Sequence, residues 1–166
     1  MPILPAAQSL WDQIYQNVFA DGRFMSYIKG LGVTLQITIC ACILGIIIGL
    51  VVAIVKVSRE SSKSPILKVL NKVCDVYLSI FRGTPVMVQL LIFSLVIFGK
   101  SPIPKEWVCV IAFGINSGAY VSETIRAGIM AVDAGQMEAG RSLGLTTITT
   151  YRYIILPQAL KNILPA

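Results

Sequence analysis

The sequence predicts an all-α fold: a multi-span transmembrane helical protein with about three full spans and the start of a fourth. Of its 166 residues, 55% are hydrophobic and only 13% are charged, whereas an average soluble domain carries about 25% charged residues. Apolar runs long enough to cross a bilayer alternate with short polar segments. The formal charge of +6 is distributed between those runs, which indicates orientation in a membrane rather than binding to nucleic acid.

Residues 1–27 are expected to form an N-terminal arm, external or interfacial, before a transmembrane domain that covers residues 28–166. Trp11, Tyr15 and Phe19 recur at helical spacing, which predicts an amphipathic helix with its aromatic rings at the level of the lipid headgroups. The arm has no basic region followed by an apolar core. A cleavable signal peptide is therefore not predicted.

The first span is predicted over residues 28–55, with its most apolar part at residues 37–55. Small residues repeat every four positions along one helix face: Ala41, Gly45, Gly49 and Ala53. Such residues allow a neighbouring helix to approach closely in lipid, so we predict a helix-packing face. The alternative is that glycine and alanine are simply common in such spans.

The densest basic segment follows over residues 56–72. It sets five basic residues against the single acid Glu60: Lys56, Arg59, Lys63, Lys68 and Lys72. The positive-inside rule places this segment, which is predicted to be a loop, in the cytoplasm. The N-terminus of the chain would then lie outside.

The second span is predicted over residues 73–98 and is less regular than the first. Pro85 lacks a backbone donor and disfavours helix at the residue before it, so the span is expected to be bent or broken near its cytoplasmic end. Arg82 would lie in the inner leaflet, where it either extends to the headgroups or serves a function. Gln89 is a further polar residue in this span and a weaker candidate for lining a pathway.

The third span, predicted over residues 107–132, is the most polar. Asn116, Tyr120 and Glu123 fall on one helix face, and Arg126 is close enough along the helix to pair with Glu123. An ionisable group within a span is costly unless it is paired or hydrated, so Glu123 marks either a pathway or a buried polar contact. A second face carries small residues that again favour close packing: Gly114, Gly118 and Ser122.

Residues 133–157 form a short polar stretch rich in glycine and threonine. Asp133 with Gln136 has the form of a capping box, which predicts a helix over residues 134–143. Gly144 can adopt the left-handed conformation that ends such a helix, and the threonines that follow suit the cap of a second helix. We therefore predict a helix, a sharp turn and a second helix outside the bilayer. The alternative is an ordinary polar loop.

Other kinds of site find little support in the sequence. There is no histidine, and the four cysteines have neither metal-ligand nor disulfide spacing: Cys40, Cys42, Cys74 and Cys109. No paired acid and base suggest a catalytic residue, and no P-loop for ATP occurs. No catalytic site, no metal site and no cofactor are therefore predicted on this chain.

Seven residues of the polar stretch stand at fixed offsets: Glu138, Ala139, Gly140, Gly144, Ile154, Leu156 and Pro157. Their spacing resembles the EAA signature of the membrane subunits of bacterial ABC importers, with Gly140 where alanine is usual. The runs RGTP-x-x-x-Q around Arg82 and A-Y-x-x-E-x-x-R-x-G around Glu123 resemble the polar amino-acid uptake branch of that family. The resemblance covers residues 29–166. Members of this branch normally continue through further spans, so the permease domain is expected to be incomplete at its C-terminal end.

The resemblance implies a transmembrane permease subunit of an ATP-driven amino-acid import complex in the bacterial inner membrane, with residues 28–166 as its permease domain. The seven motif residues would couple it to a cytoplasmic ATP-binding ABC subunit that carries ATP and Mg. It also implies an external solute-binding protein, a second permease subunit in a homodimer or heterodimer, membrane lipid and an amino-acid substrate as partners. Two alternatives stay open: a non-transporting truncated membrane fragment, and part of a secondary transporter.

Six intramembrane polar residues are candidates for lining the translocation pathway: Arg82, Gln89, Asn116, Tyr120, Glu123 and Arg126. Two roles compete for Glu123 and Arg126. They could meet the ammonium and carboxylate groups of an amino acid, or they could form a structural ion pair that fixes helix register. Pairing three residues apart satisfies both charges within the helix, which slightly favours the structural role.

Overall fold

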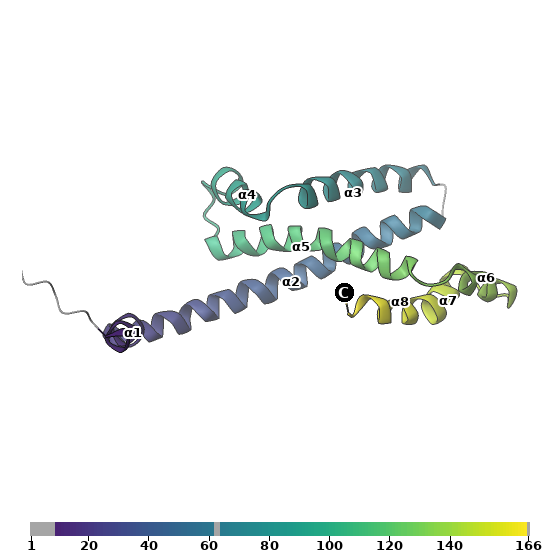
Figure 1. The fold of residues 1–166 in the computed structure, drawn as a ribbon. Coiled ribbons are helices and arrows are strands. Elements are labelled where there is room, and N and C mark those ends of the chain that lie inside the picture. The colour runs from purple at the N-terminus through teal and green to yellow at the C-terminus, as the bar shows by residue number, and fades with distance from the viewer. Residues whose placement is uncertain (1–8, 62–63, 166) are drawn as a thin grey trace, which may run out of the picture. The chain divides into compact units, whose positions relative to one another are not determined.

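The computed structural model describes residues 9–61 and 64–165, and within these ranges every regular element is a helix (Figure 1). The elements are α1 (Leu10–Val18), η1 (Ala20–Gly22), α2 (Arg23–Ser61), α3 (Pro65–Gly83), α4 (Val86–Leu91), η2 (Ile92–Ile97), α5 (Lys105–Met130), α6 (Ala134–Ser142), α7 (Thr147–Thr150), η3 (Tyr151–Ile155) and α8 (Leu156–Ile163). Of these, η1 is a 3-10 helix, whereas η2 and η3 are π-helical. The predicted all-α fold class is confirmed.

The chain divides into two units, the first ending at Ile39 and the second beginning at Cys40. This boundary falls inside α2, as does the predicted boundary between residues 27 and 28. The functional division into an arm and a permease domain stays a prediction.

In the first unit, α1 and the start of α2 bring three aromatic rings together. Tyr15 and Phe19 stack with their ring centroids 6.1 Å apart, and Phe19 stacks on Phe24 at 6.0 Å. The Tyr27 hydroxyl donates a hydrogen bond of 3.2 Å to the Asn17 carbonyl. The helix predicted from the aromatic spacing is therefore confirmed as α1, while its position at the lipid headgroups stays a prediction.

Among the described residues, two helices are long and apolar enough to cross a membrane, Arg23–Arg59 within α2 and Lys105–Met130, which is α5. A third candidate span consists of α3 and the run Val86–Ile97, which meet at an angle of 104°. The backbone is extended at Thr84 and Pro85, so the break predicted from the proline is confirmed. Because α3 is a 19-residue helix that begins earlier than predicted, the break lies deeper in this span than the sequence suggested.

The basic segment over residues 56–72 is largely helical, which corrects the prediction of a loop. Helix α2 continues to Ser61, and α3 begins at Pro65, so Lys56 and Lys68 both lie on helices. Lysine, arginine and glutamate are good helix formers, and proline is well suited to the first turn. Hydropathy therefore locates the end of an apolar run but not the end of the helix that carries it.

In the second unit, α2 and α5 pack through their small residues. A Cβ atom added to Gly45 would lie 2.8 Å from Ser117 Oγ, and one added to Gly49 would lie 2.6 Å from Val121 Cγ1. Gly114 on α5 likewise leaves no room for a Cβ atom beside a leucine of α2. Both predicted packing faces are therefore confirmed, and they face one another.

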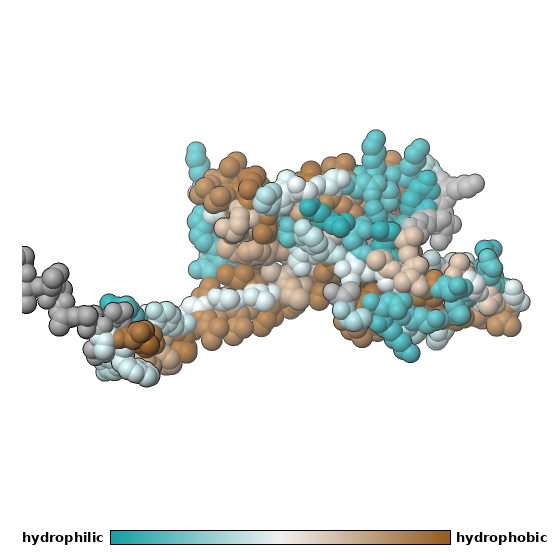
Figure 2. Space-filling view, in the orientation of Figure 1, coloured by the Kyte–Doolittle hydropathy of each residue, from teal (hydrophilic) through white to brown (hydrophobic). Residues whose placement is uncertain are grey.

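A small core lies where α2, α3 and α5 meet, and it contains Val52, Leu78 and Ala119. Most other large apolar side chains of these helices are exposed, and apolar residues cover much of the helical surface that Figure 2 shows. Such exposure is unusual for a soluble monomer. It fits helices whose outer faces contact lipid or neighbouring membrane proteins.

Candidate functional site

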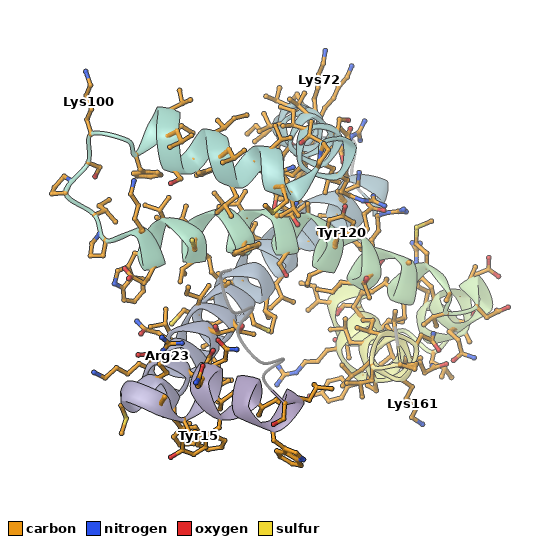
Figure 3. The ribbon with its side chains drawn as sticks, turned by 60° about the vertical axis from the view of Figure 1, so that its left-hand side comes forward. Tyr15, Arg23, Lys72, Lys100, Tyr120 and Lys161 are labelled. Carbon is orange, nitrogen blue, oxygen red and sulfur yellow. The ribbon has the colours of Figure 1, made fainter. Side chains whose placement is uncertain are left out.

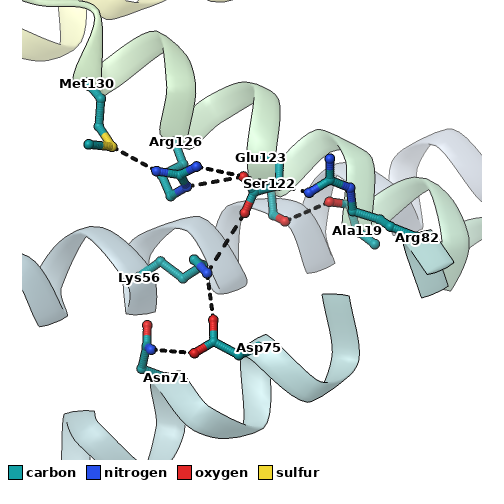
Figure 4. Close-up of polar contacts among 9 residues, drawn as sticks. All are labelled: Lys56, Asn71, Asp75, Arg82, Ala119, Ser122, Glu123, Arg126 and Met130. Carbon is teal, nitrogen blue, oxygen red and sulfur yellow. Dashed lines mark hydrogen bonds and ion pairs between the residues drawn. The ribbon is translucent and has the colours of Figure 1, made fainter. Parts of the chain in front are cut away.

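Glu123 on α5 is the anionic centre of a charged cluster (Figure 4). Its Oε2 atom lies 2.8 Å from Arg126 Nη2, which confirms the predicted ion pair, and 3.8 Å from Arg82 Nη1 at the end of α3. Its Oε1 atom lies 3.9 Å from Lys56 Nζ on α2. The Glu123 side chain is only 19% exposed, and its carboxylate contacts cations on three helices: α2, α3 and α5.

Lys56 and Asp75 extend this cluster, and sequence reasoning missed both as site residues. Lys56 Nζ lies 2.7 Å from Asp75 Oδ1, and Asn71 Nδ2 donates a hydrogen bond of 2.8 Å to Asp75 Oδ2. Lys56 and Asp75 belong to different helices, so no spacing along one helix indicates that they meet. Lys56 is the first residue of the predicted loop and Asp75 lies three residues beyond its end, and charges at these two positions were the only available signal.

An open hollow of about 560 Å³ lies beside these charges, and it is lined by Lys56, Asp75, Leu78, Ser79, Arg82, Gly83 and Glu123. The guanidinium carbon of Arg82 lies 5.7 Å from the centroid of the Tyr120 ring, which projects from α5 (Figure 3). Cations and carboxylates around one hollow can pair with both charges of a zwitterion. The arrangement is therefore chemically suited to a small molecule that carries an ammonium and a carboxylate group.

Gln89 and Asn116 contact each other. Asn116 Nδ2 donates to Gln89 Oε1 at 2.9 Å and to the Phe81 carbonyl at 3.1 Å, while Gln89 Nε2 donates to the same carbonyl at 3.0 Å. Gln89 is only 5% exposed. The six pathway candidates thus divide into this amide pair and a group around the carboxylate: Arg82, Tyr120, Glu123 and Arg126.

The helix–turn–helix element, formed by α6, the turn and the helical run α7–η3–α8, carries the motif residues. Asp133 caps α6 by accepting a hydrogen bond of 2.7 Å on Oδ1 from the Gly135 amide. Thr146 caps α7 by accepting one of 3.2 Å on Oγ1 from the Thr149 amide. The helix starts predicted from aspartate and threonine are therefore confirmed.

Gly144 makes the turn between the two helices. Its φ is +79°, its amide donates to the Arg141 carbonyl at 3.0 Å, and the Leu145 amide donates to the Gly140 carbonyl at 3.0 Å. These two bonds form a Schellman motif, in which the left-handed residue is usually glycine. The predicted left-handed conformation of Gly144 is confirmed.

The remaining motif residues lie on the helical run after the turn. Ile154 belongs to the π-helical segment η3, and Pro157 is the second residue of α8, so that helix continues through the proline. The proline follows the π-helical segment η3 closely, where the regular i→i−4 hydrogen-bond pattern is already interrupted, so its missing N–H is accommodated there. Gln158 Nε2 donates to Gln136 Oε1 at 3.4 Å, which connects α8 to α6.

Gly140 faces the second helix of the element. It is buried, and a Cβ atom added to it would lie 2.7 Å from Cγ2 of Thr150, which is itself fully buried. The alanine that is usual at this position would not fit without a shift of Thr150. The neighbouring Glu138 and Ala139 are exposed.

Two large apolar side chains stand on either side of the turn. Leu143 is 78% exposed and Ile148 is 80% exposed, whereas Leu145 between them is only partly exposed. Sequence reasoning missed both because they belong to no motif. The available signal was the presence of large apolar residues beside the glycine and the threonines of the turn.

The described residues contain no group of three or more cysteine, aspartate or glutamate residues that could hold a metal ion. Every buried side-chain nitrogen and oxygen among them has a hydrogen-bond partner. What this part of the chain offers chemically is charge pairing at the cluster and apolar contact at the turn.

Comparison with known proteins identifies the family of this chain and the share of its relatives' length that it covers. The family model described as "Binding-protein-dependent transport system inner membrane component" matches residues 45–166. The chain is 41% identical over 141 residues to the arginine transport system permease protein ArtQ of Bacillus subtilis (strain 168), an alignment that covers 84% of this chain and 61% of ArtQ. It also matches a crystal structure of an amino acid ABC transporter with histidines, at a TM-score of 0.68 and 44% identity, over 86% of this chain and 67% of that one. The chain therefore spans less than two thirds of the length of ArtQ.

Proposed function

The chain belongs to the family of binding-protein-dependent transport system inner membrane components, and we propose that it acts as a transmembrane permease subunit of an ATP-driven amino-acid import complex. Two candidate spans, and a third formed by the bent pair, supply helices for part of a translocation pathway. The similarity to an arginine permease and to an amino acid ABC transporter supports an amino acid as the substrate.

The observation that carries this proposal is the pair of exposed apolar side chains, Leu143 and Ile148, on the helix–turn–helix element. An amphipathic helix that places apolar anchors in a groove is a common mode of protein recognition. We propose that the element docks in a surface groove of a cytoplasmic ATP-binding subunit, with Glu138 and Ala139 also facing that partner. Gly144 fixes the turn that presents these residues.

The other motif residues support the element from within. Gly140 allows α6 to pack closely on Thr150, while Ile154, Leu156 and Pro157 shape the second helix. In this proposal these residues transmit movement of the partner subunit to the spans. Closure of the partner on ATP binding would move the element and, through it, the spans.

ATP hydrolysis is assigned to the partner subunit, which would bind ATP and Mg. The sequence of this chain contains no P-loop. In this proposal the chain is not an enzyme and binds no cofactor of its own.

For the charged cluster, we propose a structural role for Glu123 and Arg126. Three cations from three helices already surround the Glu123 carboxylate, so its charge is compensated within the chain. Arg82, whose side chain is 43% exposed, and Tyr120, which is also exposed, are the better candidates for facing a substrate in the hollow.

The remaining partners follow from the family. An external solute-binding protein would deliver the amino acid, and a second permease subunit, identical or different, would complete the pathway within the lipid. We place the N-terminus outside a bacterial inner membrane and the helix–turn–helix element in the cytoplasm, because basic residues concentrate between residues 56 and 72. The family match does not favour a secondary transporter.

A pull-down from membranes tests the docking proposal. The tagged chain is expected to co-purify with a P-loop ATPase, and Gly144→Val is expected to release it while insertion in the membrane is retained. A β-branched residue at φ +79° is strained, so the turn would open. Gly144→Asn is the matched control, since asparagine tolerates the left-handed conformation.

Two results would contradict the proposal. One is a chain that is inserted and intact but binds no ATPase. The other is an ATPase that stays bound to the Gly144→Val chain as firmly as to the Gly144→Asn chain.

A further inference from the structure

Pro85 leaves one particular carbonyl group without its helical partner. In a continuous helix the amide of residue 85 would donate to the carbonyl of residue 81, but proline has no N–H group. The chain instead runs extended through Thr84 and Pro85, with ψ values of 146° and 134°. The Phe81 carbonyl therefore needs another donor, because an unpaired backbone group inside a span is costly.

Two side-chain amides supply that donor. Gln89 Nε2, from α4, lies 3.0 Å from the Phe81 oxygen, and Asn116 Nδ2, from α5, lies 3.1 Å from it. Asn116 also donates to Gln89 Oε1 at 2.9 Å, so the two amides hold each other in this orientation. We call Gln89 and Asn116 the amide clamp.

Gln89 also forms hydrogen bonds with Thr84, the C-cap residue of α3. Its Nε2 atom lies 2.6 Å from Thr84 Oγ1 and 3.1 Å from the Thr84 carbonyl. Thr84 in turn donates its hydroxyl hydrogen to the Ile80 carbonyl at 2.7 Å. The Gln89 side chain is therefore bonded to the protein through both its nitrogen and its oxygen, and it is only 5% exposed.

The amide clamp lies next to Arg82 in the structure. Arg82 follows the clamped Phe81 carbonyl directly, and its guanidinium group lies 5.7 Å from the centroid of the Tyr120 ring and 3.8 Å from Glu123. Asn116 is four residues before Tyr120 on α5. The clamp thus joins the last turn of α3 to the α5 face that Arg82 contacts.

We infer that Gln89 and Asn116 are positioning residues: they replace the hydrogen bond that Pro85 removes, hold the 104° break between α3 and α4, and keep Arg82 against Tyr120 and Glu123. This role takes the place of the pathway-lining role expected for both residues from the sequence. Its link to transport rests on the proposed function, but its geometry does not.

The test measures the break directly. Spin labels at Val73 on α3 and Val96 on η2, both exposed, report the distance across the break by pulsed electron spin resonance. The chain would be reconstituted in lipid nanodiscs with its four native cysteines replaced. The parent should give one narrow distance distribution, and Gln89→Leu should broaden or shift it. Gln36→Leu, at an exposed position of α2, is the matched control and should leave it unchanged.

A compensating variant makes the test specific. Pro85→Ala restores the missing N–H group, so the Gln89→Leu, Pro85→Ala double variant should recover a narrow distribution at a longer distance, as expected for a straighter helix. If Gln89→Leu alone fails to insert, recovery of inserted protein in the double variant supports the clamp. No recovery in that case overturns it.

Transport is measured in parallel but does not decide the inference. A distribution that is the same in the parent, Gln89→Leu and Gln36→Leu overturns the amide clamp, even if Gln89→Leu lowers uptake, which would then indicate contact with substrate. A distribution that changes only in Gln89→Leu supports the clamp, even if no variant transports an amino acid and the proposed function fails.

Discussion

The charged cluster and the helix–turn–helix element differ in whether their side chains find partners within the chain. Around Glu123, three cations lie within 3.9 Å of one carboxylate, so the charges are compensated inside the chain. At the turn, the backbone ends are capped, but Leu143 and Ile148 are 78% and 80% exposed. The comparison shows that polar residues within the spans can serve the chain's own geometry, whereas the element presents a surface that another protein can complete.

The largest effect on the fold is expected at the centre of the cluster. Glu123→Gln removes the anion shared by three cations, which should lower the free energy of unfolding in detergent by about 3 kcal/mol, the low end for a buried pair. Glu106→Gln, at an exposed position in the first turn of α5, should change it little. If both variants unfold alike and only the Michaelis constant for the amino acid changes in Glu123→Gln, the carboxylate serves the substrate and the comparison fails.

A smaller effect is expected where the element packs on itself. Gly140→Ala places a Cβ atom 2.7 Å from Thr150 Cγ2, and this overpacking should cost about 1–3 kcal/mol. Thr150→Ala should remove most of that cost in the double variant, as measured by a double-mutant cycle.

Gly32→Ala provides the matched control for Gly140→Ala. A Cβ atom at this helical glycine would have no neighbour within 4 Å, so the substitution should stabilise the chain by about 0.5–1 kcal/mol. If Gly140→Ala raised the free energy of unfolding as Gly32→Ala does, the packing of Gly140 against Thr150 would not matter.

A substitution at the edge of the charged cluster should lower the free energy of unfolding less than a substitution at its centre. Lys56→Met breaks the 2.7 Å contact with Asp75 and the 3.9 Å contact with Glu123. Because Asp75 is 49% exposed and Glu123 keeps its two arginines, the loss should be about 1 kcal/mol. Lys100→Met, in the exposed turn before α5, is the control. A loss for Lys56→Met as large as that for Glu123→Gln would place the centre of the cluster at Lys56.

The smallest effect on the fold is expected at the turn itself. Leu143→Ser and Ile148→Ser change exposed side chains, so each should alter the free energy of unfolding by less than about 0.5 kcal/mol. Both should nevertheless weaken co-purification with the ATPase subunit. Leu164→Ser, also highly exposed, should leave co-purification intact, and equal binding by all three variants would argue against docking through the turn.

Local chemistry in the sequence predicted much of this structure. Asp133 and Thr146 cap helices, Gly144 is left-handed, and Pro85 breaks a span. Each of these outcomes depends on residues within about one helical turn, so spacing and residue type were sufficient.

The features that the sequence did not predict depend on contacts between distant segments. Asp75 meets Lys56 across two helices, and Gln89 and Asn116 meet at a carbonyl that only the break exposes. The π-helical segments η2 and η3 also lacked a local signal. Such pairings follow from how helices pack, which no single helical pattern encodes.

The most direct test of the account is photocrosslinking from Ile148 in intact membranes. A photoreactive amino acid at this position should form one crosslink to a P-loop ATPase subunit, and Gly144→Val in the same chain should abolish it. The same amino acid at Val96, which is 76% exposed on η2, should not capture the ATPase. A crosslink from Val96 but none from Ile148 would contradict coupling through the helix–turn–helix element.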